Sequence, residues 1–369
     1  MTATDRRHDL SALPLRPELV GEEPYGAPQL QVPVRLNVNE NPYPPPLQVR
    51  EAMAAAVLEA GETINRYPDR EAGALRADLA AYLGHGLTAE NLWAANGSNE
   101  AMIQALNAFA GPGRAVAAFT PTYSMYPEYA RDTHSAYLTC PREVDFMIDP
   151  ERAAAFVAAH QPAVVIVTTP NNPTGTPTAL PVVAAIAEAS TGIVIVDEAY
   201  QEFARHRDAT AISLLDRFDN LIISRTMSKA FAFAGGRVGY VAASPAIIDA
   251  LRIVRLPYHL SALTQAVARV ALAHADVMLE AVDELRATRD ASIAQLRSLG
   301  FDVIDSDANF WLFGRFDDRH AVFERFLDHG VLVRETGPSE YLRVCAGTPE
   351  EMAVFHEAAA LIAKENHHR

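Results

Sequence analysis

The feature that most constrains this fold is a set of short runs that are apolar at every position. A half-exposed strand alternates apolar and polar residues, whereas these runs place apolar side chains on both sides, which is typical of strands covered by helices on both faces. A helical stretch at 179–189 separates two of the runs, and this alternation predicts a mostly parallel α/β sheet. The runs span residues 115–119, 163–167, 193–196, 221–223 and 238–241.

The sequence pattern changes after residue 260, where short helical and strand-like stretches mix. With 369 residues, the chain is long enough for two domains at about 100–200 residues each. We predict a large α/β domain over 47–260 and a small α+β domain over 261–369. The proline-rich segment 41–46 precedes the large sheet, so we expect residues 1–46 to return and join the small domain. The small domain is expected to contain a helical region up to 299, strands at 301–304, 309–313, 331–333 and 341–344, and helices at 320–329 and from 349.

Charge and composition exclude several classes of protein. The net charge of −15 does not give the electrostatic footprint of a nucleic-acid-binding protein, although a small basic pocket in an acidic shell would suit an anionic substrate. Cys140 and Cys345 are too few for a disulfide framework and wrongly spaced for a zinc site, so we expect buried free thiols and no metal. Residues 1–10 lack the apolar core of a signal peptide, and no window reaches the roughly 18 apolar residues of a membrane span. We therefore expect a cytoplasmic protein that does not bind membranes.

Unusual polar residues follow four of the apolar runs. In a parallel sheet covered on both faces, ligands bind outside the carboxyl ends of the strands. Each polar segment alone has an ordinary explanation as a turn, a helix cap or solvated surface, but together they predict one site at this edge. The segments are Thr120-Pro121-Thr122-Tyr123, Thr168-Thr169-Pro170-Asn171-Asn172-Pro173-Thr174-Gly175, Asp197-Glu198-Ala199-Tyr200 and Ser224-Arg225-Thr226-Met227-Ser228-Lys229.

Several common catalytic motifs are absent from the sequence. Gly111 and Gly113 lack the third glycine of G-x-G-x-x-G because residue 116 is valine, which argues against a nicotinamide site. His356-Glu357 does not continue to H-E-x-x-H because residue 360 is alanine. Neither G-x-x-x-x-G-K-[ST] nor G-x-S-x-G occurs. The motif search therefore does not support a P-loop enzyme, a zincin or a hydrolase with a nucleophile elbow.

A lysine after one strand and an aspartate at the end of another fit pyridoxal-phosphate chemistry. A lysine amine forms a Schiff base with the aldehyde of this cofactor, and a carboxylate keeps the ring nitrogen protonated, so that the ring accepts electrons from a substrate carbanion. Hydroxyl groups, an arginine and a helix N-terminus can hold the phosphate. We therefore expect pyridoxal 5'-phosphate as the cofactor.

Short motifs in a fixed order also carry a family resemblance. The chain resembles the fold-type I, class II pyridoxal-phosphate aminotransferases, and is most similar to the histidinol-phosphate aminotransferase family, over residues 20–360. The segments 170–175 and 228–229 are typical of the superfamily, and the remaining motifs favour the narrower family. The motifs span residues 36–42, 66–69, 96–100, 170–175, 197–200, 226–237 and 255–261.

The resemblance implies roles around the cofactor ring. Lys229 would be the Schiff-base lysine and the acid/base that moves a proton between substrate and cofactor, and Asp197 would pair with the ring nitrogen. Tyr200 and Asn172 would both hydrogen-bond the phenolic oxygen of the ring. Tyr123 would stack on the ring face, for which plain core packing is the alternative explanation.

The resemblance also implies a phosphate cup. Backbone N–H groups at a helix N-terminus would face the phosphate, although Ser98 equally suits a simple helix cap. Tyr67 would reach the phosphate from the neighbouring subunit, which makes the site a property of a homodimer. The cup residues expected from one chain are Gly97, Ser98, Asn99, Thr226, Ser228 and Arg237.

At the substrate end the implied assignments have open alternatives. Arg343 matches the family arginine that binds the anionic group of the substrate. Arg334 is a second candidate, and solvated surface explains it equally well. Asn39, Tyr25 and Tyr258 match positions that line the substrate pocket, but both tyrosines could instead be packing aromatics.

The implied reaction is ping-pong transamination. Histidinol phosphate and 2-oxoglutarate would exchange an amino group to give imidazole-acetol phosphate and glutamate, a step of histidine biosynthesis. The nearest alternative is an aromatic-amino-acid aminotransferase on the same scaffold, and a phosphothreonine decarboxylase is a further one. A non-catalytic ligand-sensing module is disfavoured, because Lys229 is present with its expected partners and the chain is acidic.

Overall fold

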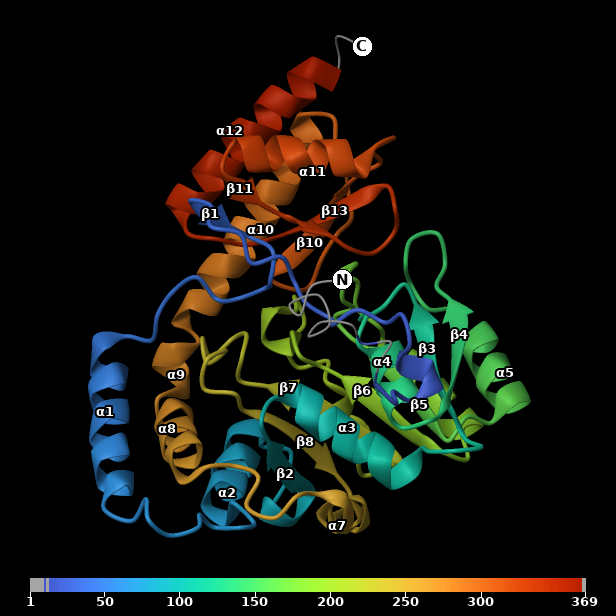
Figure 1. Cartoon of the computed structure of the whole chain (residues 1–369), viewed down its shortest axis with the longest axis vertical. Coiled ribbons are helices and arrows are strands. Elements are labelled where there is room, and N and C mark those ends of the chain that lie inside the picture. Colours follow the sequence, from blue (N-terminus) through green and yellow to red (C-terminus); the bar gives the residue numbers. More distant parts are fainter. Residues whose placement is uncertain (1–9, 11–12, 367–369) are drawn as a thin grey trace.

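The main sheet of the protein has seven strands (Figure 1). The computed structural model describes residue 10 and residues 13–366. Residues 1–9 and 11–12, with which the predicted small domain begins, therefore lie outside the described residues. In spatial order the strands are β2 (Leu92–Ala95), β8 (Gly239–Ala243), β7 (Leu221–Thr226), β6 (Ile193–Asp197), β5 (Val164–Thr168), β3 (Ala115–Thr120) and β4 (Ala136–Pro141).

Most neighbouring strands in this sheet run parallel. The pairs from β7 across to β4 are parallel, whereas β8 is antiparallel to both of its neighbours. The prediction of a mostly parallel α/β sheet is therefore confirmed, and each of the five apolar runs forms a strand. The patterns miss β2 and β4, because β4 is a partly exposed edge strand without a continuous apolar run and β2 is only four residues long.

Alternate side chains of the central strands enter two different cores, which explains why their sequences are apolar at every position. In β5, Val165 and Val167 belong to one core while Val164 and Ile166 belong to the other. The first core also receives side chains from α2 (Gly73–Leu83), α5 (Pro150–His160) and α6 (Leu180–Ala189). The second receives them from α3 (Ser98–Phe109), α4 (Tyr126–Asp132) and α7 (Pro245–Val254).

The C-terminal part of the chain forms a smaller antiparallel sheet, which lies at the top of Figure 1 in orange and red. Its strands are, in spatial order, β12 (Arg334–Glu335), β13 (Tyr341–Cys345), β10 (Phe310–Gly314) and β9 (Asp302–Val303). Helix α11 (Arg319–Asp328) packs against β12 and β13. Helix α12 (Pro349–Asn366) packs against α11 and contacts β10 through the rings of Phe355 and Phe313. The strands and helices predicted after residue 300 therefore exist, with boundaries that differ by one or two residues.

The expected helical region before residue 299 is divided into separate helices. These are α8 (Ala262–Ala273), α9 (Ala275–Met278) and α10 (Glu280–Ser298). α8 packs against α1 (Leu47–Gly61) and α2 rather than against the C-terminal sheet. The predicted domain boundaries at residues 46 and 260 stay predictions. Short 3-10 helices lie at Pro17–Leu19, Ala89–Asn91, Gln201–Phe203 and Ala211–Leu214.

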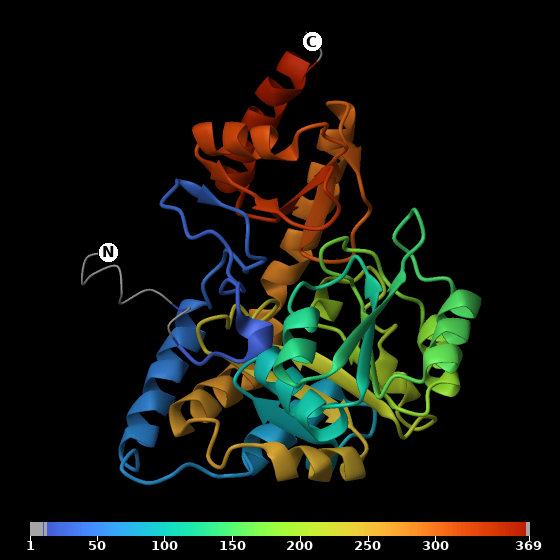
Figure 2. The same cartoon turned by 45° about the vertical axis from the view of Figure 1, so that its right-hand side comes forward.

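The N-terminal segment bridges the two parts of the molecule. Strand β1 (Val34–Arg35) pairs in parallel with β11 (Val331–Leu332), and Figure 2 shows this blue segment beside the C-terminal elements. Residues that precede β1 in the chain lie against α4, a helix that packs on the large sheet. Glu22 there forms an ion pair with Arg131 of α4 at 2.8 Å. The segment therefore connects the C-terminal sheet to the carboxyl edge of the large sheet.

Two expectations from the composition concern the cysteines and the helices that could span a membrane. Cys140 and Cys345 are both buried and free, as predicted. Within residues 13–366, no helix combines the length and the hydropathy that a membrane span requires.

Candidate active site

The polar edge predicted from the sequence surrounds one cavity of about 260 Å³. The strand register places Thr168 beside Asp197, and Asp197 beside Ser224, at the carboxyl ends of β5, β6 and β7. The cavity carries more positive than negative side chains although the chain is acidic, which favours an anionic ligand. Its charged lining residues are Lys229, Arg237, Arg334, Arg343 and Asp197.

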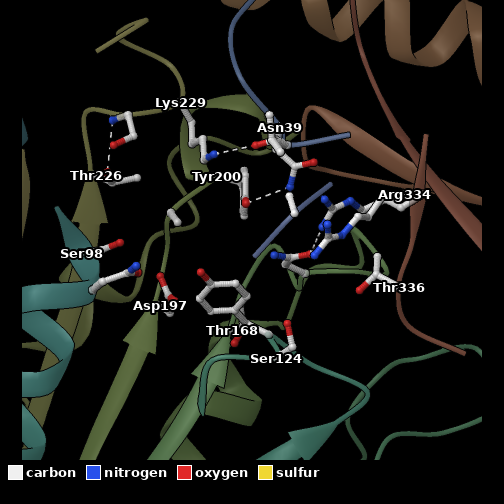
Figure 3. Close-up of a pocket in the computed structure, with 18 of the residues that line it drawn as sticks. Asn39, Ser98, Ser124, Thr168, Asp197, Tyr200, Thr226, Lys229, Arg334 and Thr336 are labelled. Atoms are coloured by element: carbon white, nitrogen blue, oxygen red, sulfur yellow. Dashed lines mark hydrogen bonds between the residues drawn. The ribbon is translucent and has the colours of Figure 1, made fainter. Parts of the chain in front are cut away.

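Lys229 brings a buried amine into this cavity. It lies in the turn that follows β7, and its Nζ donates a hydrogen bond to the carbonyl oxygen of Val38 at 3.0 Å (Figure 3). Burial, and then the positive charge of Arg343, lower the pKa of Lys229 to about 8. More of this amine is therefore neutral near neutral pH than in an ordinary lysine, and the neutral amine is the form that attacks a carbonyl or accepts a proton.

Asp197 presents a buried carboxylate oxygen that has no hydrogen-bond partner among the described residues. This atom is Oδ1, whereas Oδ2 accepts a hydrogen bond from the Tyr126 hydroxyl at 2.8 Å. Burial raises the pKa of Asp197 to about 6 although the Tyr126 hydrogen bond opposes the shift, because taking a carboxylate out of water disfavours its charged form. A protonated pyridine nitrogen supplies both a hydrogen bond and the opposite charge, so the site fits pyridoxal phosphate at this atom.

Tyr200 and Asn172 both line the cavity, and each is fixed by one neighbour. Asn39 Nδ2 donates to the Tyr200 hydroxyl at 3.0 Å (Figure 3), and Arg343 Nη1 donates to Asn172 Oδ1 at 2.5 Å. Burial raises the pKa of Tyr200 to about 12, so its phenol stays protonated at neutral pH. The Tyr200 hydroxyl and the Asn172 amide nitrogen therefore remain donors for a ligand oxygen.

The first turn of α3 meets Arg237 at the other end of the cavity. Gly97 is the N-cap of α3 with φ +82°, and an added Cβ would overlap Arg237 Nη2. Ser98 and Asn99 line the cavity from the start of this helix, where Figure 3 shows Ser98. A helix N-terminus attracts anions, so its N–H groups and the adjacent guanidinium suit a phosphate.

Thr226, the last residue of β7, and Ser228, in the turn after it, extend this cup. The Ser228 N–H donates to Thr226 Oγ1 at 3.1 Å, and Arg237 Nη1 donates to Ser228 Oγ at 3.5 Å. Both hydroxyl-bearing residues line the cavity. The predicted phosphate-cup residues of one chain therefore lie together.

Arg343 and Arg334 line the cavity from β13 and β12. Arg343 Nη2 donates to the carbonyl oxygen of Asn37 at 2.9 Å, and Arg334 Nη2 donates to that of Gly26 at 3.2 Å. Arg343 Nε and Arg334 Nη1 are buried without a hydrogen-bond partner in the described part of the chain. Because unpaired buried donors are unfavourable, these guanidinium groups are suited to an anionic ligand. Arg334 is thus part of the cavity wall rather than solvated surface.

Tyr25 and Tyr123 meet edge to face at the cavity. Their ring centroids lie 6.4 Å apart at an interplanar angle of 87°, and Ser124 Oγ donates to the Tyr25 hydroxyl at 3.4 Å. Both tyrosines line the cavity. The N-terminal segment therefore supplies part of the binding site.

Tyr67 and Tyr258, like Gly97, are predicted site residues that do not line the cavity of their own chain. Their rings stack on each other, with centroids 4.4 Å apart and an interplanar angle of 16°. Tyr67 is 80% exposed and Tyr258 is 41% exposed. Two stacked aromatic rings that are this exposed are typical of a surface that another molecule covers.

Comparison with known proteins identifies the family. A family model for aminotransferase class I and II matches residues 32–358. The chain belongs to this family. This aminotransferase is 59% identical to the histidinol-phosphate aminotransferase of Thermobifida fusca, over 94% of each chain. It is 50% identical to the enzyme of that name from Corynebacterium diphtheriae, over 96% of this chain and 98% of the relative.

A solved structure also resembles this aminotransferase closely. The histidinol-phosphate aminotransferase of Sinorhizobium meliloti, in complex with pyridoxal-5'-phosphate, superposes with a TM-score of 0.86 and is 25% identical. The match covers 96% of this chain and 99% of the other. The predicted family and the predicted fold type are thereby confirmed.

Some residues of the aminotransferase site have roles that the sequence does not indicate. Asn37 and Val38 act through backbone carbonyl oxygens, which leave no signature in the residue type. Thr168 lies in a segment that the sequence did flag, but without a role of its own. Tyr126 begins α4, three residues after the predicted Tyr123, and no sequence motif assigns it a role.

Proposed function

We propose that the chain is a pyridoxal-phosphate-dependent histidinol-phosphate aminotransferase that uses 2-oxoglutarate as amino acceptor. The observation that carries the proposal is one cavity that holds both the buried Lys229 amine and the unpaired Asp197 Oδ1. The names of relatives at 50–59% identity support the substrate. The cofactor in the Sinorhizobium meliloti structure supports pyridoxal phosphate.

Pyridoxal phosphate supplies an aldehyde that binds amines covalently and a ring that accepts electrons from the substrate Cα. In our proposal, Asp197 pairs with the ring nitrogen, and Tyr200 and Asn172 donate to the ring's phenolic oxygen. Tyr123 packs on the ring face. The phosphate is held by Gly97, Ser98, Asn99, Thr226, Ser228 and Arg237.

Lys229 has two tasks in this proposal, which are to bind the aldehyde and to move a proton. Its Nζ would move the proton from the substrate Cα to the cofactor C4′ in the first half-reaction and in the opposite direction in the second. A general base works best when its pKa is near the working pH, and the pKa of Lys229, lowered to about 8 by burial, meets this condition. The same amine is thus able both to accept and to release a proton.

Arg343 is proposed to bind the anionic group of both substrates. Histidinol phosphate presents a phosphate, whereas 2-oxoglutarate presents a carboxylate near the same place. The planar guanidinium fork pairs with either group. Arg334 is the second candidate, because it brings another unpaired donor to the same cavity.

We further propose that the enzyme is a homodimer in which Tyr67 reaches the phosphate of the neighbouring subunit. The exposed stack of Tyr67 on Tyr258 supports this assignment, and it also brings Tyr258 toward the neighbouring site. Sedimentation velocity at assay concentrations should show a dimer. A fully active monomer would contradict the assignment.

A donor comparison tests the proposed function. The purified protein should bind pyridoxal phosphate and transfer the amino group of histidinol phosphate to 2-oxoglutarate with a much higher kcat/KM than that of phenylalanine. Lys229→Ala should still bind the cofactor through the phosphate cup but should lose turnover. A preference for phenylalanine would instead indicate an aromatic-amino-acid aminotransferase.

A further inference from the structure

Asp197 is connected to a second residue that the mechanism above does not use. Tyr126 lies at the start of α4, is fully buried, and donates from its hydroxyl to Asp197 Oδ2 at 2.8 Å. The Tyr126 hydroxyl also lies 2.7 Å from Thr168 Oγ1. A phenol has one proton, and a carboxylate accepts but does not donate. The Tyr126 proton therefore goes to Asp197, and Thr168 donates to Tyr126.

Thr168 is itself held in place at the end of β5. Its carbonyl oxygen accepts a hydrogen bond from Arg142 Nη2 at 3.3 Å, and Arg142 Nε donates to the carbonyl oxygen of Phe119 at 3.1 Å. Its side chain lies 3.1 Å from Thr122 Oγ1. Arg142 is buried, so these contacts hold the end of β5 in one position.

The two oxygens of Asp197 consequently have different environments. Oδ2 accepts a hydrogen bond from a buried phenol whose own position is fixed, whereas Oδ1 is unpaired. A hydrogen bond to the charged form of a carboxyl group lowers its affinity for a proton. A weaker base opposite the pyridine nitrogen leaves the shared proton on the ring, and a protonated ring is the better electron acceptor.

We propose that Tyr126, oriented by Thr168, is a positioning residue that keeps the proton of the Asp197–cofactor pair on the ring nitrogen. It does so by fixing Oδ2 with a hydrogen bond and leaving Oδ1 as the single oxygen that faces the ring. This inference rests on the proposed function, because it needs pyridoxal phosphate in the cavity. Tyr126 touches neither the substrate nor the reacting atoms in this scheme.

The test uses two matched variants on one helix. Tyr126→Phe removes only the hydroxyl that contacts Asp197. Tyr129→Phe is the control, because Tyr129 lies on the same helix, is also buried, and has a hydroxyl with no hydrogen-bond partner among the described residues. The two variants therefore make the same chemical change at comparable sites and differ in the contact with Asp197.

The direct readout is the NMR chemical shift of an isotope-labelled ring nitrogen in bound pyridoxal phosphate. We expect Tyr126→Phe to move this shift toward that of an unprotonated pyridine, with kcat at least about tenfold lower and KM within about threefold of the parent. Tyr129→Phe should keep the parent values. A Tyr126→Phe enzyme with the parent nitrogen shift would overturn the inference, whatever its kcat.

A second pair of variants keeps the inference testable if Tyr126→Phe does not fold. Thr168→Val removes the donor to Tyr126 and should move the nitrogen shift in the same direction, and Thr168→Ser should restore it. Equal shifts in the two Thr168 variants would contradict the proposed chain of contacts. If the parent protein bound no pyridoxal phosphate, the proposed function and this inference would both be wrong. If the parent enzyme transaminated but its variants kept the parent nitrogen shift, this inference would be wrong and the proposed function would stand.

Discussion

Replacing Gly97 with alanine should weaken cofactor binding while the fold survives. Gly97 caps α3 at φ +82°, and a methyl group there would overlap Arg237 Nη2 and lie 3.2 Å from its Cζ. The guanidinium is the mobile end of a long side chain, so it can swing away at little cost to the fold. Moving it removes the arginine from the phosphate cup.

The substitution should change two quantities, the Kd for the cofactor and the free energy of unfolding, by separate effects. Loss of one hydrogen bond to a charged group is worth about 1.5–3 kcal/mol, and about 1.4 kcal/mol corresponds to a tenfold change in a binding constant. We therefore expect the Kd for pyridoxal phosphate to rise by about tenfold to about hundredfold. The strained backbone separately lowers the free energy of unfolding by about 1–3 kcal/mol.

Gly84 offers a matched control. It has φ +70° at the C-cap of α2, and an added Cβ there meets nothing within 4 Å. Gly84→Ala should thus lower the free energy of unfolding, as measured by chemical denaturation, without changing the Kd measured by absorbance titration of the apoprotein. If Gly97→Ala and Gly84→Ala bound the cofactor equally well, Arg237 would not be acting on the phosphate as described.

Three further outcomes are expected. Asp197→Asn should lower kcat by at least about a hundredfold at saturating cofactor, because breaking a buried charged pair costs about 3–5 kcal/mol; a loss below about tenfold would refute the ring-nitrogen role. Arg343→Ala should lower kcat/KM at least about tenfold for each substrate in single-turnover assays, and Arg343→Lys should recover part of the loss. An effect on histidinol phosphate alone would assign the 2-oxoglutarate carboxylate to Arg334. Burial lowers the pKa of Lys229 to about 8 from 10.5, so the unfolded apoprotein binds more protons in that interval and the free energy of unfolding should rise with pH there. In Lys229→Met, pH-dependent denaturation curves should lack this rise, and an unchanged slope would contradict the lowered pKa.

Residues at strand ends were predictable because local sequence decides where a buried strand stops. A run such as 193–196 is apolar throughout because both faces of β6 are covered, and the first charged residue after it, Asp197, therefore marks the sheet edge. The rule fails at β7, where the first charged residue, Arg225, is buried within the strand and paired with Glu198 and Glu202. Parallel strands then bring these ends together without further information from the sequence.

Other features depend on tertiary packing that the sequence does not display. The break between α8 and α9 falls at His274, whose φ is −117°, with no proline or glycine there to announce it. The contact between Tyr126 and Asp197 exists because α4 packs over the strands, and no short-range pattern encodes that distance. The contacts of Val38 and Asn37 are made by carbonyl groups, which every residue type possesses.

The contacts of the segment around Val38 have a consequence for how the protein is made. The Asn37 carbonyl oxygen accepts a hydrogen bond from Arg343, a residue 306 positions later. Among the residues that the structure describes, β1 pairs with β11 alone. A ribosome must therefore synthesise almost the whole C-terminal sheet before this segment finds its place. A nascent chain that ends before β13 can form the large sheet but lacks one wall of the cavity. Cofactor capture should accordingly follow translation rather than accompany it.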